Sequence, residues 1–203
     1  MKIALVGASG AVGSRILQEL AARGHQVTAI ARDPSRIPAA PGVTAVAGDA
    51  RRVETLAPLL KGHDAVVSSI HFSDSDAAVL IAAVKAAGVR RYLVVGGAGS
   101  LEVAPGVALY DIPEFPAIYL TEAKAGGAFL DLLKGEAELE WTFLSPSAEF
   151  VPGERTGVFR LGTDALLTSA SGRSFISYED FAAALVDEIE HPRHVRARFT
   201  IGY

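Results

Sequence analysis

Cysteine is absent from the 203 residues of this sequence, and several other features are scarce. Without cysteine the chain can form no disulfide, no thiolate metal site and no cysteine nucleophile. The five histidines show no spacing typical of metal ligands, so we predict no metal site. The net charge is −4 and there is no basic run, which argues against nucleic acid as a partner, because a phosphate backbone requires clustered positive charge.

Long apolar runs are also missing, although half of the residues are hydrophobic. None of the runs approaches the roughly eighteen residues needed to cross a bilayer. Met1 and Lys2 lead directly into a buried strand, so we expect no signal segment. We therefore expect a soluble, cytoplasmic protein with no membrane partner, folded as one domain over residues 1–203.

The most informative stretch opens the chain. Lys2–Val6 has the pattern of a buried strand, residues 7–13 read Gly-Ala-Ser-Gly-Ala-Val-Gly, and Ala11–Arg23 has the pattern of an amphipathic helix. A strand that runs through a glycine turn into a helix leaves the first helical amides unpaired at the carboxyl edge of the sheet. Such an arrangement is an anion site.

Each glycine of this turn has its own physical role. Gly7 permits a sharp bend, Gly10 allows a pyrophosphate to approach the backbone, and Gly13 lets the helix lie close to the strand. The spacing G-x-x-G-x-x-G departs from the common dinucleotide motif, and a purely structural glycine turn is the alternative. We predict that a dinucleotide binds to Gly7, Ser9, Gly10, Ala11, Val12 and Gly13.

Arginine follows the second predicted strand, Gln26–Ala31, where an enzyme selective for NAD would place an acid. A guanidinium at this position can bind a 2′-phosphate through charge-assisted hydrogen bonds. Arg32, Ser35 and Arg36 are therefore predicted to select NADP(H) over NAD(H). The alternative is that these are solvated loop residues beside Asp33 and Pro34.

Strands and helices alternate along the rest of the chain, which predicts a parallel sheet with right-handed crossovers. The further predicted strands are Val43–Ala47, Asp64–Ser68, Tyr92–Val95, Glu140–Leu144 and Arg198–Ile201, with extended pieces near Gly153–Leu161 and Ser174–Ile176. The further predicted helices are Arg51–Leu60, Ala77–Ala87, Ala117–Lys134 and Tyr178–Glu190.

Two of these helices carry more specific expectations. Ser177 is predicted to cap the last helix, with Asp180 as its capping-box partner. The apolar helix Ala77–Ala87 must be covered either by the sheet or by a partner subunit, so a homodimer is possible.

Ligand-binding candidates lie where strands end, because ligands of open α/β sheets bind at the carboxyl edge. Asp49 could accept a hydrogen bond from an adenine amino group or, as an equally good alternative, cap the following helix. Ser68, Ser69 and Ile70 end the fourth strand. Gly97 and its neighbours after the fifth strand would let a nicotinamide approach the backbone.

Candidate catalytic groups are fewer. Ser100 is predicted to project its hydroxyl towards the hydride-transfer site. His71 could reach a nicotinamide or a substrate oxygen, although a histidine there is more often an exposed loop residue.

A long connection, Leu101–Pro116, carries three prolines and no clear periodicity, which is typical of a lid or binding loop. The apolar side chains on and beside it favour an apolar or aromatic substrate, with packing against the sheet as the alternative. They are Leu101, Leu109, Tyr110, Phe115 and Tyr119.

Several of these segments, in this order, resemble the atypical short-chain dehydrogenase/reductases, in the NAD(P)H-binding branch that includes NmrA-like proteins and flavin reductase/biliverdin-IX beta reductase. The segments are the glycine turn, residues 32–36, Gly48–Asp49, the strand leading into Ser100, and residues 176–180.

The resemblance implies a Rossmann-type, doubly wound α/β fold with a mostly parallel sheet and helices on both faces. Residues 1–145 would be the cofactor-binding core and residues 146–203 a smaller substrate-side part. Gly10–Val12 would hold the pyrophosphate, Asp49 and Ala50 the adenine, and Ser68–Ile70 the ribose and nicotinamide.

The chain also departs from these families. Tyr119 and Lys124 are five residues apart rather than four, which turns the lysine about 100° away on a helix, so a Tyr-Lys proton relay is unsupported and Tyr119 is kept as a weak candidate. Ser147 stands where the flavin reductase branch has a histidine.

The leading functional prediction is an NADPH-dependent oxidoreductase that reduces a flavin, quinone or other conjugated carbonyl compound by hydride transfer. A non-catalytic NADP(H) sensor of the NmrA kind is the alternative. A nucleotide-sugar epimerase or dehydratase is less favoured, because it would require the same missing tyrosine.

Overall fold

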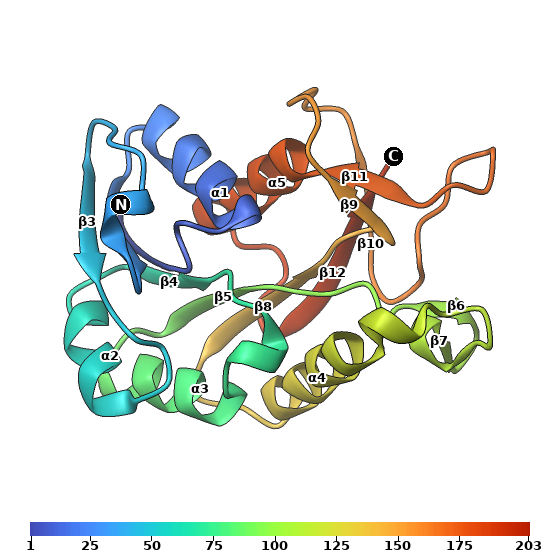
Figure 1. Cartoon of the computed structure of the whole chain (residues 1–203), viewed down its shortest axis with the longest axis horizontal. Helices are drawn as coiled ribbons and strands as arrows, with labels where there is room; N and C mark the ends of the chain where they lie inside the picture. Colours follow the sequence, from blue (N-terminus) through green and yellow to red (C-terminus); the bar gives the residue numbers. More distant parts are fainter.

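The computed structural model describes residues 1–203 and contains one central sheet with helices on both faces (Figure 1). Its eight strands run in the order β10-β12-β8-β5-β4-β1-β2-β3, and only the β10–β12 pairing is antiparallel. The predicted doubly wound, mostly parallel α/β fold is confirmed. No helix is long and apolar enough to cross a membrane.

Most elements lie within one or two residues of their predicted ends. The exception is the extended piece predicted at Gly153–Leu161, of which only the end is a strand, β10 Arg160–Gly162. The strands of the main sheet are β1 Lys2–Val6, β2 Gln26–Ala31, β3 Val43–Ala47, β4 Ala65–Ser68, β5 Arg91–Val95, β8 Glu140–Ser145, β10 Arg160–Gly162 and β12 Ala197–Gly202. The helices are α1 Ala11–Ala22, α2 Val53–Leu60, α3 Ala77–Ala86, α4 Ala117–Lys134 and α5 Tyr178–Glu190. Short 3-10 turns are η1 Pro34–Arg36, η2 Phe72–Asp74 and η3 Leu109–Asp111.

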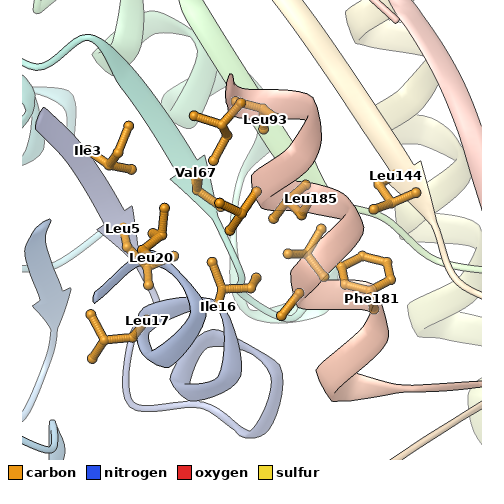
Figure 2. Packing of buried hydrophobic residues seen from close by; sticks show 14 of the residues in the cluster. Ile3, Leu5, Ile16, Leu17, Leu20, Val67, Leu93, Leu144, Phe181 and Leu185 are labelled. Atoms are coloured by element: carbon orange, nitrogen blue, oxygen red, sulfur yellow. The ribbon is translucent and has the colours of Figure 1, made fainter. Parts of the chain in front are cut away.

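Two apolar layers hold the sheet. On one face α1 and α5 pack side by side, and Figure 2 shows Ile16, Leu20 and Leu185 meeting the side chains of β1, β4 and β5. On the other face α2, α3 and α4 cover a second cluster around Val66, Tyr92 and Phe143. Helix α3 buries Leu80, Ile81 and Val84 in that cluster. The apolar face of α3 is therefore covered by the sheet.

Register aligns the strand ends that matter for ligand binding. Val6 of β1 is opposite both Ile30 of β2 and Ser68 of β4, and Val95 of β5 is opposite Leu144 of β8. The loops that follow these strands therefore emerge at one edge. The order of the sheet reverses between β1 and β4, which is where doubly wound folds form their ligand crevice.

The connection Leu101–Pro116 has more structure than its sequence indicated. It contains a small antiparallel hairpin of β6 Glu102–Ala104 and β7 Val107–Ala108, followed by η3. The backbone of Glu102 pairs with residues 164–166, so this segment is held by a loop far away in the sequence. The hairpin itself is local, but the residues that hold it in place are far away in the sequence, so its position could not be predicted from the segment alone.

The capping prediction for α5 was half right. The Ser177 hydroxyl accepts from the Asp180 amide at 3.0 Å, as expected for an N-cap. The Asp180 carboxylate instead accepts from the Tyr203 hydroxyl at 2.6 Å and the Gly157 amide at 2.7 Å. Asp180 is therefore not the capping-box partner, because it ties the chain's last residue and the 156–157 loop to α5. Two strands, β9 Glu149–Val151 and β11 Phe175–Ser177, form a separate parallel pair beside it.

Candidate functional site

The turn between β1 and α1 is built by close backbone packing at two glycines. Gly7 has φ +88°, and a Cβ there would lie 2.1 Å from the carbonyl oxygen of Ser69. A Cβ on Gly13 would lie 2.2 Å from the carbonyl oxygen of Gly7. Only glycine fits at these two positions. The predicted strand-turn-helix geometry is present, and the chain that leaves β4 packs directly against the turn.

The head of α1 presents unpaired donors. Gly10 is the N-cap and offers no side-chain cap, and the amides of Ala11, Val12 and Gly13 donate to no acceptor in the chain. A Cβ on Gly10 would have only the Gly7 carbonyl within 4 Å, at 3.3 Å, so the space in front of it is open. These residues, with the half-buried Ser9 beside them, fit a pyrophosphate group.

The loop after β2 holds two unpaired arginines. Arg32 and Arg36 are exposed and form no ion pair, whereas Asp33 accepts from the Ser35 hydroxyl at 2.6 Å and the Ser35 amide at 3.1 Å. The hydrogen bonds from Ser35 hold the pKa of Asp33 below its ordinary value. Asp33 thus fixes η1, and Ser35, predicted to bind phosphate, already has a partner.

Asp49 does not cap α2. The N-cap of α2 is Arg52, and Asp49 Oδ1 accepts from the Arg51 amide at 3.0 Å to form a local turn. The capping alternative is wrong because the helix begins later than Arg51. Ala50 packs against the edge of the cluster under α2.

A cavity of about 630 Å³ opens at the carboxyl edge of the sheet. It begins at the head of α1, passes the exits of β4, β5 and β8, and ends against α4 and the start of α5. Its polar lining is sparse and its walls are mostly apolar or aromatic. The lining includes Gly10, Ala11, Val12, Ser69, Ile70, His71, Gly97, Ser100, Tyr119 and Ser147 among the predicted site residues.

Ser68 is not part of this cavity. Its buried hydroxyl forms a 2.9 Å hydrogen bond with the Tyr92 hydroxyl, and burial raises the pKa of that tyrosine. The prediction that Ser68 contacts the cofactor is therefore wrong for its side chain, because the hydroxyl is bonded in the interior. The strand alternation points Ser68 into the layer under α3 and leaves Ser69 and Ile70 at the cavity.

Ser100 has a partner that the sequence did not indicate. Arg198 of β12 donates through Nη1 to the Ser100 carbonyl at 2.9 Å and to its Oγ at 3.0 Å. The same guanidinium donates to Asp164 Oδ1 at 2.8 Å. Because the Ser100 oxygen accepts from arginine, its own hydroxyl proton is left to donate into the cavity.

The other catalytic candidates differ in how they are held. The Ser147 hydroxyl is fully buried and donates to the Ile201 carbonyl at 2.9 Å, so it serves the β8–β12 packing and does not point its donor at the cavity. Tyr119 is exposed on the first turn of α4 and lines the cavity, whereas Lys124 does not. His71 is exposed, with Nδ1 3.4 Å from Glu122.

Glu122 is a site residue that the sequence analysis missed. Its carboxylate accepts from the Phe72 amide at 2.7 Å and the Ser73 amide at 2.8 Å, which fixes η2 against α4. Burial alone would raise its pKa, but the hydrogen bonds from Ser73 and Phe72 and the nearby His71 outweigh it and hold the pKa of Glu122 below the ordinary value.

Aromatic side chains from separate parts of the chain complete the cavity. Phe150 and Tyr178 meet edge to face with ring centroids 4.7 Å apart, and Phe72 approaches from η2. From the lid segment, Leu109 and Phe115 line the cavity, whereas Leu101 is buried in the interior and Tyr110 packs against Gly99 and Gly127. Part of the predicted apolar lining is therefore structural packing.

Comparison with known proteins agrees with this geometry. A family model described as NAD(P)H-binding matches residues 7–192, and the chain belongs to that family.

Close relatives span the whole chain. The Bacillus subtilis protein YwnB is 43% identical over 211 residues, 99% of this chain and 98% of its own. A Bacteroides thetaiotaomicron structure, of a protein proposed to be an epimerase, is 45% identical with a TM-score of 0.95 and covers 100% of this chain and 96% of its own. A Streptococcus pneumoniae structure, of a protein proposed to be an NADH-flavin reductase, is 35% identical with a TM-score of 0.86. The match covers 100% of this chain and 99% of that one.

Proposed function

We propose that this protein is an NADPH-dependent oxidoreductase that reduces a small conjugated acceptor such as a flavin, quinone or carbonyl compound. The observation that carries the proposal is that one cavity joins the predicted cofactor site to an aromatic wall. The unpaired amides at the head of α1 and the aromatic wall of Phe72, Phe150 and Tyr178 line the same cavity. A dinucleotide bound by its pyrophosphate at α1 would extend its nicotinamide towards that wall.

The preference for NADPH rests on the loop after β2. Arg32 and Arg36 are exposed and unpaired, and no acid follows β2 at the position where a ribose would be held. A guanidinium gives about 1.5–3 kcal/mol to each hydrogen bond with a charged phosphate. The carboxylate of Asp33 accepts from Ser35, so its negative charge weakens the attraction of these arginines for a phosphate without removing it.

When bound, the reduced cofactor supplies a hydride, and the acceptor gains its second hydrogen as a proton. The residues of this chain position the acceptor and stabilise the charge that it gains. Ser100 can donate its free hydroxyl proton in a hydrogen bond to a carbonyl oxygen of the acceptor, and Arg198 behind it holds the serine oxygen in place. The proton itself reaches the acceptor from solvent, since the cavity opens to the surface at the exposed Tyr119.

A panel of acceptors tests the proposal. Purified protein is mixed with NADPH and with riboflavin, FMN, menadione or an aromatic aldehyde, and the loss of absorbance of the reduced cofactor is followed. Turnover of any acceptor supports the oxidoreductase. Ser100→Ala should then lower kcat by roughly 10-fold or more, the lower range for a lost catalytic hydrogen bond.

A non-catalytic sensor of NADP(H) is the second candidate, and a specific observation favours it. The buried Ser147 hydroxyl is already bonded, and the only tyrosine facing the cavity from α4, Tyr119, has no lysine four residues on. Tight NADPH binding by titration calorimetry, with no turnover across the whole panel, would support the sensor and refute the oxidoreductase.

A further inference from the structure

The charges around the cavity are of one sign. Apart from Tyr119 and Tyr178, its titratable lining groups are His71, Glu114, Glu122 and Glu149, and no lysine or arginine lines it. A ligand in the acceptor half of the cavity therefore meets carboxylates and no free cation.

Three arginines lie directly behind the lining, but each is already paired with a carboxylate. Arg173 binds Glu149 at 2.6 Å, Arg15 binds Glu179 at 3.1 Å beside Tyr178, and Arg198 binds Asp164. Each pair contributes little net charge. Glu149, although it lines the cavity, is therefore largely neutralised by Arg173.

Two carboxylates remain without a basic partner other than histidine. Glu114 stands on the lid segment next to Phe115, is exposed, and forms no hydrogen bond or ion pair. Glu122, on α4, also lines the cavity, accepts from two backbone amides and faces His71. These hydrogen bonds favour its ionised form. The acceptor half of the cavity is thus bordered by negative charge on both the lid and α4.

We propose, on the basis of the oxidoreductase function above, that this cavity selects an uncharged planar acceptor and discriminates against one that carries a phosphate or carboxylate. The aromatic and apolar walls bind the ring, and the carboxylates of Glu114 and Glu122 repel an anionic substituent. A neutral quinone or an unphosphorylated flavin fits this site, and a flavin nucleotide does not.

Riboflavin and FMN provide a matched pair of probes, because they share one ring system and differ by a phosphate. With saturating NADPH at low salt, kcat/KM for riboflavin should exceed that for FMN by about 10-fold or more, as expected for like-charge repulsion across a cavity. The ratio should fall towards one in 1 M salt, because the screening length drops from about 30 Å at 0.01 M to about 3 Å. Measuring both flavins at each salt concentration cancels any effect of salt on the cofactor.

A charge-removing variant assigns the effect to its residue. Glu114→Gln should lower the riboflavin-to-FMN ratio about threefold or more at low salt. Glu54→Gln removes an exposed carboxylate from the first turn of α2, outside the cavity, and should leave the ratio unchanged. Three results would overturn the selectivity while leaving the oxidoreductase in place. They are a ratio near one in the unmodified protein, a preference for FMN, and a ratio that changes neither with salt nor in Glu114→Gln.

Binding gives a readout that does not depend on turnover. Quenching of flavin fluorescence by the protein with NADP⁺ present should report a dissociation constant for riboflavin about 10-fold below that for FMN. Equal affinities, or binding of neither flavin, would overturn the proposal even if another acceptor were reduced. Failure of every acceptor in the turnover panel, with riboflavin still bound preferentially, would instead refute the proposed function and leave the selectivity standing.

Discussion

Replacement of Gly10 by alanine should weaken cofactor binding and leave the fold intact. Gly10 has φ −74° and ψ 169°, a conformation open to alanine, and the added Cβ would meet only the Gly7 carbonyl, at 3.3 Å. Alanine gains up to about 1 kcal/mol by restricting the unfolded chain. It loses a similar amount as a poorer N-cap. The free energy of unfolding should therefore change by no more than about 1 kcal/mol.

The same methyl group fills the space where a phosphate oxygen must approach the amides of α1. Loss of one charge-assisted hydrogen bond corresponds to about 1.5–3 kcal/mol. Since about 1.4 kcal/mol is a factor of ten in affinity, the dissociation constant for NADPH should rise about 10-fold to 100-fold.

Titration calorimetry with NADPH and urea denaturation measure the two effects separately. Gly135→Ala is the matched control, because Gly135 also has a negative φ, its Cβ would meet only the Leu132 carbonyl at 3.5 Å, and it ends α4 away from the cavity. It should change neither cofactor affinity nor stability by much. A folded Gly10→Ala protein that binds NADPH as tightly as the unmodified chain would refute the placement of the pyrophosphate.

Three further predictions address selectivity and stability. Arg32→Ala should weaken NADPH binding by about 2–3 kcal/mol and leave NADH nearly unchanged; equal losses for both cofactors in calorimetry would contradict 2′-phosphate recognition. Glu19 forms ion pairs with Arg155 and Arg23, and the hydrogen bond from Arg155, against the opposing effect of burial, holds its folded pKa below the ordinary 4.5. The contribution of Glu19 to the free energy of unfolding is therefore complete above its unfolded pKa and is lost as the pH falls through its folded pKa. Glu19→Gln should flatten the acid limb of a curve of stability against pH measured by urea denaturation. Glu188→Gln should destabilise the fold by about 3 kcal/mol, because Glu188 binds the buried Arg91 at 2.9 Å; an unchanged urea midpoint would contradict this.

The sequence by itself predicted the parts of this protein that depend on neighbouring residues. Helix and strand periodicities predicted the α/β alternation. Helices α1 and α3 end close to Gly24 and Gly88, whose positive φ values of +76° and +73° are ones that glycine adopts readily. The glycine turn predicted the anion-binding head of α1 because the three glycines and the start of the helix lie within thirteen consecutive residues.

Tertiary structure alone decided which side chains face the cavity. Ser100 is bonded to Arg198, 98 residues away, because only β8 lies between β12 and β5 in the sheet order. Ser68 and Ser147 lie at the carboxyl ends of strands, as Ser69 and Ser100 do, yet their hydroxyls are bonded in the interior. Glu122 of α4, Phe150 of β9 and Tyr178 at the start of α5 line one cavity only because the tertiary fold brings these elements together. Local pattern fixes whether a residue belongs to a strand, helix or turn, but the partner of a polar group depends on which distant segment the sheet brings beside it.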